Sequence, residues 1–251
     1  MPVNEYVTER LRIEASDSLY SLRMPSRPKL REIVATLEKF HGKPAPFPSN
    51  DPWELILREN ASYLVDDATR EEVFRSLKAR VGVSPKAILG APHERLVESI
   101  EKGGMRPPMR ADKLLEAARL AIETGLFELR KLARKGGSEA RKVLKRFPGI
   151  GEPGADKLLL AAGSAVTLAP ESNGLRVLVR IGFAAEDKNY SRTYRAAAEA
   201  VASELPEDRT WLVGAHQLLR RHGQETCRRS EPRCDVCPLA KGCEFTRRAK
   251  P

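Results

Sequence analysis

Cysteine is absent from this 251-residue chain before position 227, so disulfides across the body of the protein are excluded. No apolar run approaches the length of a membrane span. The opening residues contain no apolar core of the kind that secretory signal peptides carry. No stretch alternates apolar and polar residues over the length of a strand, which argues against a sheet. We therefore expect a helical protein in the cytoplasm, with no membrane association.

The charge is strongly unbalanced. The formal net charge is +10 and the sequence pI is about 9.6. Such an excess favours a polyanionic partner through the release of counterions, although many basic proteins bind nothing specific. The length suffices for one large or two small domains, each with a hydrophobic core.

Apolar residues recur with helical spacing along most of the chain, which predicts the all-α class. Proline and glycine interrupt this pattern between residues 44 and 52, between 103 and 108, at 136–137 and between 148 and 154. Asp51 and Ser84, each followed by proline, are expected to cap helices. The expected helical stretches are 28–42, 52–82, 84–92, 93–104, 110–125, 138–147, 155–163 and 190–205.

The four cysteines form a C-x6-C-x2-C-x5-C array made of Cys227, Cys234, Cys237 and Cys243. Four thiolates that can converge on one point indicate a metal site. A zinc ribbon more often shows two C-x2-C pairs, whereas one such pair with longer flanking gaps suits a 4Fe-4S cluster. The cluster is the favoured reading, with zinc second and disulfides last.

A second motif, Pro148-Gly149-Ile150-Gly151, lies between two amphipathic stretches. Two glycines around one apolar residue allow a tight hairpin with exposed N–H groups, and Ile150 would plug that hairpin onto its helices. The second helix would direct its positive N-terminal end towards a DNA phosphate. An ordinary helical turn is the alternative, because the motif is weak by itself and gains force only with the cysteine array.

Together the hairpin and the cysteine array resemble the endonuclease III and MutY-type DNA glycosylases of the helix–hairpin–helix superfamily, from about Lys29 to Phe245. The resemblance implies a two-domain all-α fold with double-stranded DNA crossing between the domains. It also implies a 4Fe-4S cluster, a monomer and association with the nucleoid. The expected parts are an extension over 1–25, a cluster domain from 26–47 plus 167–251, and a six-helix domain over 48–166 with its hairpin at about 140–163.

Members of this family that also cleave the DNA strand carry a lysine two residues after the second hairpin glycine, where it forms a Schiff base with the sugar. The matching residue here is Pro153, so strand-cleaving lyase activity is expected to be weak or absent. Lys157 lies one turn further along and is expected at the surface or on a phosphate. Another amine, such as Lys157 or the N-terminus, is the less favoured route to processing abasic sites. Glu152 is unexpected beside a phosphate-binding hairpin.

The resemblance also points to two catalytic carboxylates. Glu171 matches the aspartate that stabilises positive charge on the sugar, or Ser172 does if the loop slips by one residue; Glu171 as a mere helix cap is the alternative. Glu59 matches the glutamate with which MutY-type enzymes protonate adenine. Its apolar neighbours predict a raised pKa suited to a general acid, and a salt-bridged glutamate is the alternative.

Further residues are expected to contact DNA. Tyr63 and Leu64 follow the helix of Glu59 and are candidates for an apolar wedge between bases, or for core packing. Asp66 or Asp67 is expected to cap the next helix. A cluster-folded loop would present Arg228, Arg229 and Arg233 to phosphates.

The sequence therefore predicts a DNA base-excision repair glycosylase without strong lyase activity, which flips out a damaged or mispaired base and hydrolyses its N-glycosidic bond. The rival hypothesis is a lesion-binding protein of the same fold with little or no catalytic activity. The loss of the family lysine and aspartate favours the rival, and Glu59 argues against it.

Overall fold

The computed structural model describes residues 27–248. Within this range every regular element is a helix, apart from one isolated bridge between Tyr63 and Gly104, so the predicted all-α class is confirmed. The extension predicted over residues 1–25 lies outside the described residues. The elements are α2 (Leu30–His41), α3 (Pro52–Ala61), α4 (Asp67–Arg80), α5 (Pro85–Gly90), α6 (His93–Ser99), η1 (Glu101–Gly103), α7 (Pro107–Thr124), α8 (Leu126–Lys135), α9 (Gly137–Leu144), α10 (Glu152–Ala162), α11 (Ser172–Ile181), α12 (Tyr190–Ala202), α13 (Arg209–Glu225), η2 (Ala240–Gly242) and α14 (Glu244–Arg248).

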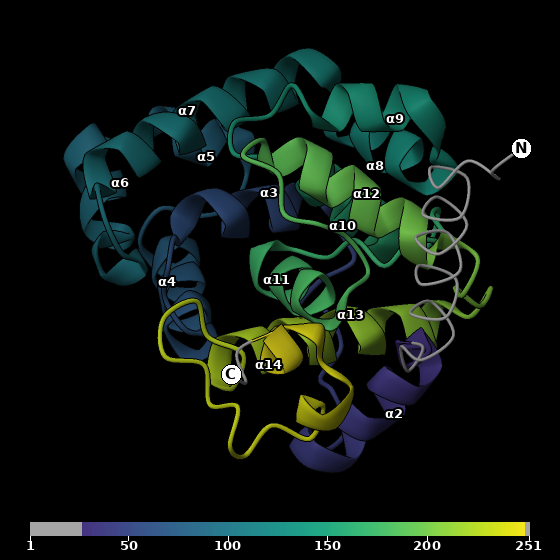
Figure 1. The fold of residues 1–251 in the computed structure, drawn as a ribbon. Coiled ribbons are helices and arrows are strands. Elements are labelled where there is room, and N and C mark those ends of the chain that lie inside the picture. The colour runs from purple at the N-terminus through teal and green to yellow at the C-terminus, as the bar shows by residue number, and fades with distance from the viewer. Residues whose placement is uncertain (1–26, 249–251) are drawn as a thin grey trace, which may run out of the picture.

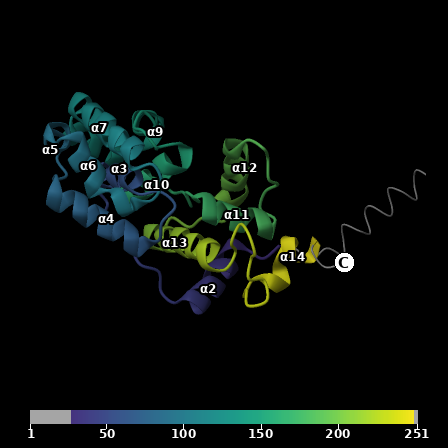
Figure 2. The same ribbon diagram turned by 90° about the vertical axis from the view of Figure 1, so that its left-hand side faces the viewer.

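The buried apolar side chains form two main clusters. The first is built from α3 to α10, and the second from α2, α11, α12, α13 and the cysteine segment. The two groups lie side by side, with α4 to α9 at one end of the molecule and α12 and α14 at the other (Figures 1 and 2). Both ends of the described chain belong to the second group, where Pro28 lies against Gly242. The domain boundaries derived from the sequence stay a prediction.

Helix starts follow the predicted capping chemistry. The Asp51 side chain accepts a hydrogen bond from the backbone N–H of Trp53, and the Ser84 side chain accepts one from Ala87. The periodic stretch 52–82 is two helices, because the chain turns over residues 62–66 and Asp66 caps α4 by accepting from the N–H of Thr69. The predicted cap at Asp66 or Asp67 is therefore confirmed at Asp66.

The helices α8, α11, α13 and α14 are absent from the stretches expected from the sequence, and α8 shows a physical reason. Helix α8 follows Gly125, whose positive φ of 79° ends α7 at once, and only two of its ten residues, Leu129 and Ala133, are buried. Its many charged residues weaken the apolar periodicity on which sequence reasoning depends. None of the helices in the described range is both long enough and apolar enough to cross a membrane.

Candidate active site and nucleic-acid interface

The hairpin between α9 and α10 has the conformation that its glycines suggest. Gly149 adopts a φ of 75°, a left-handed conformation that favours glycine, and a Cβ added there would lie 2.9 Å from Asn60 Oδ1. Ile150 is buried with 4% exposure, which confirms its predicted role as a plug. The N–H groups of Gly149 and Gly151 donate to no other group in the described range. They precede the positive end of α10 and are free to bind an anion.

Asn60 connects this hairpin to α3. Its buried side-chain amide donates to the carbonyl of Ile56 within α3 and to the carbonyl of Pro148 in the hairpin, both at 2.9 Å. The hairpin is therefore held against the residue that directly follows Glu59. Sequence reasoning missed Asn60, since its neighbours in sequence give no sign of a partner 88 residues away.

Glu152 and Pro153, which follow the hairpin, differ from the residues expected there from the resemblance. The structure accommodates both. The Glu152 carboxylate accepts hydrogen bonds from Nε and Nη2 of Arg195 at 3.1 and 3.0 Å, and Lys145 lies 4.0 Å away. Its charge is therefore largely neutralised beside the hairpin. Pro153 is the second residue of α10 and lies where a missing N–H costs no helical hydrogen bond.

Glu59 and Lys157 form an ion pair between α3 and α10. Lys157 Nζ donates a hydrogen bond to Glu59 Oε1, and the side chains are 15% exposed for lysine and 30% for glutamate. Burial raises the pKa of the Glu59 carboxyl, but Lys157, Arg70 and Arg220 together bring that pKa below its ordinary value. The predicted raised pKa is therefore wrong, because cations from three other helices surround this carboxylate. Lys157 faces Glu59 and is largely buried, so the surface position expected for it is wrong, while its contact with a phosphate stays a prediction.

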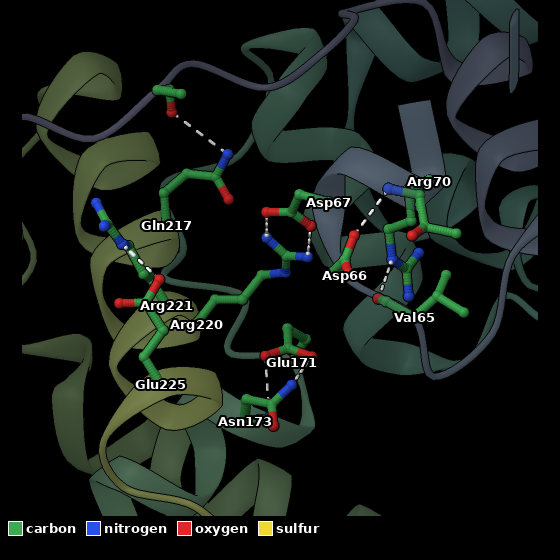
Figure 3. Close-up of polar contacts among 12 residues, drawn as sticks. Val65, Asp66, Asp67, Arg70, Glu171, Asn173, Gln217, Arg220, Arg221 and Glu225 are labelled. Carbon is green, nitrogen blue, oxygen red and sulfur yellow. Dashed lines mark hydrogen bonds and ion pairs between the residues drawn. The ribbon is translucent and has the colours of Figure 1, made fainter. Parts of the chain in front are cut away.

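Arg220 joins the two helical groups. Its guanidinium, on α13, donates to both carboxylate oxygens of Asp67 at the start of α4, with Nη1 to Oδ2 at 2.7 Å. The side chain of Arg220 is only 17% exposed, and its charge acts on Glu171 and Glu59 as well. Figure 3 shows the guanidinium directed at Asp67, with Glu171 on its other side.

Glu171 occupies the N-cap position of α11. Its Oε1 accepts from the N–H groups of Asn173 and Gly174 at 3.0 and 3.2 Å, and Oε2 accepts from the side-chain amide of Asn173 (Figure 3). The capping alternative therefore describes its contacts, and Ser172 is the first residue of the helix. Burial and the Glu171 charge raise the pKa of Tyr190 to about 12, so this phenol near Glu171 keeps its proton.

The turn after α3 presents apolar side chains to solvent. Tyr63 and Leu64 are 55% and 71% exposed, and Met105 on the facing loop is 59% exposed. The core-packing alternative does not hold for these side chains. The backbone N–H of Tyr63 donates to the Gly103 carbonyl at 2.7 Å, which joins the two loops. Leu64 has a φ of 57°, an uncommon conformation for a residue with a branched side chain.

Arg110 fixes both loops from within. It is 3% exposed, and its guanidinium donates to the carbonyls of Ala61, Gly104 and Met105. No carboxylate bonds to it in the part of the chain that the structure describes, and burial lowers the pKa of its guanidinium. Arg110 is thus a buried arginine that bonds only to backbone carbonyls, and it fixes the geometry of the two loops. The sequence does not reveal this role.

The four cysteines are free thiols gathered around α11 and α13. Arg180 Nη1 lies 3.4 Å from Cys227 Sγ, and Cys243 Sγ donates to the Arg180 carbonyl at 3.2 Å. Burial and the other three cysteines raise the pKa of the Cys237 thiol to about 11. Across residues 27–248, no three His, Cys, Asp or Glu side chains form a ready-made metal site. The donor set nevertheless fits a thiolate-bound group, since four unpaired thiols lie near enough to influence one another.

The loop between the first two cysteines carries three exposed arginines, Arg228, Arg229 and Arg233. Arg180 holds this loop by donating to the backbone carbonyls of Arg228 and Arg229 at 2.6 and 3.1 Å. All three side chains are exposed, and Arg228 Nε donates to the Glu225 carbonyl at 3.2 Å. A separate cavity of about 670 Å³ lies between residues 43–50 and α13, and none of the predicted catalytic residues lines it.

Comparisons with known proteins find relatives both in sequence and in structure. No family model matches the sequence. The chain is 33% identical over 106 residues to endonuclease III of Rickettsia conorii, a match that covers 41% of the chain and only 46% of that protein. It is 26% identical over 196 residues to endonuclease III of Escherichia coli, covering 78% of the chain and 85% of that protein.

The fold resembles solved structures over most of its length. A trapped endonuclease III–DNA covalent intermediate superimposes with a TM-score of 0.69 at 20% identity, covering 89% of this chain and 100% of that one. A thermostable thymine-DNA glycosylase superimposes with a TM-score of 0.66 at 20% identity, covering 87% and 97%. With the glycine hairpin in place, these likenesses show that the chain shares the all-helical fold of these structures.

Proposed function

We propose that this protein is a DNA base-excision repair glycosylase that hydrolyses the N-glycosidic bond of a flipped damaged or mispaired base and has little or no lyase activity. The observation that carries the proposal is the position of Glu59, a reachable carboxylate one residue from Asn60, which holds the phosphate-binding hairpin. Relatives and structural neighbours named as endonuclease III and as thymine-DNA glycosylase support the same class of activity.

Each site residue has a proposed task. Glu59, as a carboxylate, accepts a proton from the attacking water or orients that water. Glu171 stabilises the positive charge that develops on the sugar, with Tyr190 as a neutral phenol beside it. The absence of an amine at Pro153 removes the Schiff-base route of strand cleavage, which supports a monofunctional enzyme.

DNA binding is assigned to three surfaces. The N–H groups of Gly149 and Gly151, with the plug Ile150 behind them, bind phosphate at the start of α10. Tyr63, Leu64 and Met105 fill the space that the flipped base leaves in the stack. The third surface is the cysteine loop, with Arg228, Arg229 and Arg233.

We further propose that Cys227, Cys234, Cys237 and Cys243 hold a 4Fe-4S cluster, as the spacing and the free thiols support. When bound, the cluster would crosslink the last segment of the chain and so fix the arginine loop. Its role is structural, and no step of the hydrolysis depends on it.

The test is base release from duplexes that carry a panel of lesions and mismatches, developed with and without hot alkali. Wild type is compared with Glu59→Gln and with Glu54→Gln, a control on the same helix whose carboxylate pairs with Arg58. Cleavage that needs alkali, is lost in Glu59→Gln and is kept in Glu54→Gln supports a monofunctional glycosylase. Cleavage without alkali contradicts the monofunctional assignment.

One observation favours a second candidate function, a lesion-binding protein. Both oxygens of Glu171 accept hydrogen bonds from the start of α11, which engages the carboxylate that would stabilise the sugar. Tight binding to a lesion duplex with no base release from the whole panel would support this candidate and exclude the glycosylase for those substrates.

A further inference from the structure

The ion pair between Glu59 and Lys157 is the part of the candidate site that the family resemblance does not explain. Lys157 projects from α10 and donates to Glu59 on α3, although 98 residues separate them in sequence. Both side chains are largely buried yet reachable, with 15% and 30% exposure. Removing two charges from water is costly, and an apolar pair of similar size would join the helices at least as well. The pair therefore calls for an explanation other than stability.

The charged groups that act on the Glu59 pKa are cations from several elements, and one of them, Arg220, also pairs with Asp67. Arg70 on α4 and Arg220 on α13 add to the attraction of Lys157. On α13, His216 is buried, and burial together with the Lys157 charge lowers its pKa to about 3, so it is neutral. Two arginines of the other helices packed on α3, Arg110 and Arg130, have partners other than Glu59. Arg110 of α7 binds the Ala61 carbonyl and Arg130 of α8 pairs with Asp51.

We propose that Lys157 is a positioning residue, whose ammonium group keeps the Glu59 side chain ionised and aimed, so that Glu59 accepts a proton in the reaction and does not donate one. The inference rests on the proposed glycosylase function. It assigns Glu59 the role of base, opposite to the general acid expected from the sequence. It also implies that the departing base receives no proton from Glu59.

Removing the Lys157 ammonium group would leave burial as the dominant influence on the pKa of the Glu59 carboxyl. Burial alone favours the neutral carboxyl, and it is Lys157 that contributes the largest opposing effect. Lys157→Met keeps the length and helix preference of the side chain without its charge. In that variant the Glu59 pKa rises, and Glu59 becomes protonated at a pH where the wild-type carboxylate is ionised. Lys157→Arg retains a cation and serves as the conservative control.

The first readout is the titration of the Glu59 carboxyl in the DNA-free protein by carbon-13 NMR, assigned with Glu59→Gln. The expected result is a higher pKa in Lys157→Met than in wild type and a value near wild type in Lys157→Arg. Equal values in wild type and Lys157→Met would overturn the proposal. Thermal unfolding establishes that each variant is folded, and Lys157→Gln replaces the methionine variant if the latter does not fold.

The second readout is the pH profile of base release under single-turnover conditions. In Lys157→Met the acid limb moves to higher pH by the shift measured in the titration, so the rate on that limb falls about tenfold for each pH unit. In Lys157→Arg the acid limb of the pH profile is expected at the same pH as in wild type. A merely structural lysine would instead lower the rate by one factor at every pH, and that result would overturn the proposal.

The two proposals fail in distinguishable ways. If wild type releases no base from any duplex, the proposed glycosylase function fails, while the carboxyl titration still decides whether Lys157 controls Glu59. If base is released with an unchanged acid limb in Lys157→Met, the enzyme stands and the role of Lys157 falls.

Discussion

Replacing Arg110 with lysine tests whether a buried guanidinium holds the turn of Tyr63 in place. The arginine donates to four carbonyls, those of Ala61, Glu101, Gly104 and Met105, from a position that is 3% exposed. A lysine ammonium on a flexible stem lacks the planar fork and can reach about one of them. The contact to Ala61 is buried and the other three are part-buried, so losing all but one of them is expected to cost about 1–3 kcal/mol of unfolding free energy.

The assay is urea unfolding followed by circular dichroism, together with limited proteolysis of the turn at residues 62–66. Arg119→Lys is the matched control, because Arg119 lies exposed on the same helix and surface substitutions change stability by about 0.5 kcal/mol or less. We expect Arg110→Lys to unfold at lower urea and to be cut faster at the turn. Indistinguishable curves for the two variants would refute the assignment of Arg110 as the residue that fixes the loops.

Three further predictions concern the hairpin, the ion pair between the cores and the cysteines. Gly149→Ala should lower the unfolding free energy by about 1–2 kcal/mol through its positive φ, and should weaken duplex binding measured by fluorescence anisotropy. Gly151→Ala is the control, because Gly151 has a φ of −86° and a Cβ there would make only an ordinary contact with Pro153 at 3.9 Å. Equal losses of stability and binding in the two variants would contradict the geometry. Arg220 holds the pKa of Asp67 below its ordinary value, so Asp67→Asn should lower the unfolding free energy by about 0.5–1 kcal/mol near neutral pH. This loss should shrink as the pH falls through the lowered pKa. A difference in urea unfolding that does not change with pH would argue against the ion pair. Cys237→Ser should abolish stoichiometric iron and visible absorption, and full retention of iron would count against a four-thiolate cluster.

The sequence was most informative where structure is determined locally. The caps at Asp51, Asp66 and Ser84 depend on residues two or three positions away, and the hairpin depends on adjacent glycines. The plug Ile150 follows from the same short motif. Patterns of this kind need no knowledge of which helices meet.

The candidate site was less predictable because its key contacts join distant helices. Glu59 sits on a face rich in apolar residues, and from that face alone a raised pKa is a sound inference. The opposite result arises from Lys157, Arg70 and Arg220, which reach Glu59 from three other helices. In a chain with 31% charged residues, no local signal distinguishes these cations from solvated ones.

The amide of Asn60 has a consequence for how a nucleotide would be selected along the strand. One side chain links the Pro148 carbonyl of the turn proposed to bind phosphate to the helical residue next to Glu59, so the spacing between the turn and the carboxylate is set during folding. The Asn60 amide therefore fixes the distance between this turn and Glu59. In the proposed enzyme, the nucleotide that reaches Glu59 would be the one at a fixed offset from the bound phosphate, whichever base it carries, and the base would be distinguished only after it is positioned.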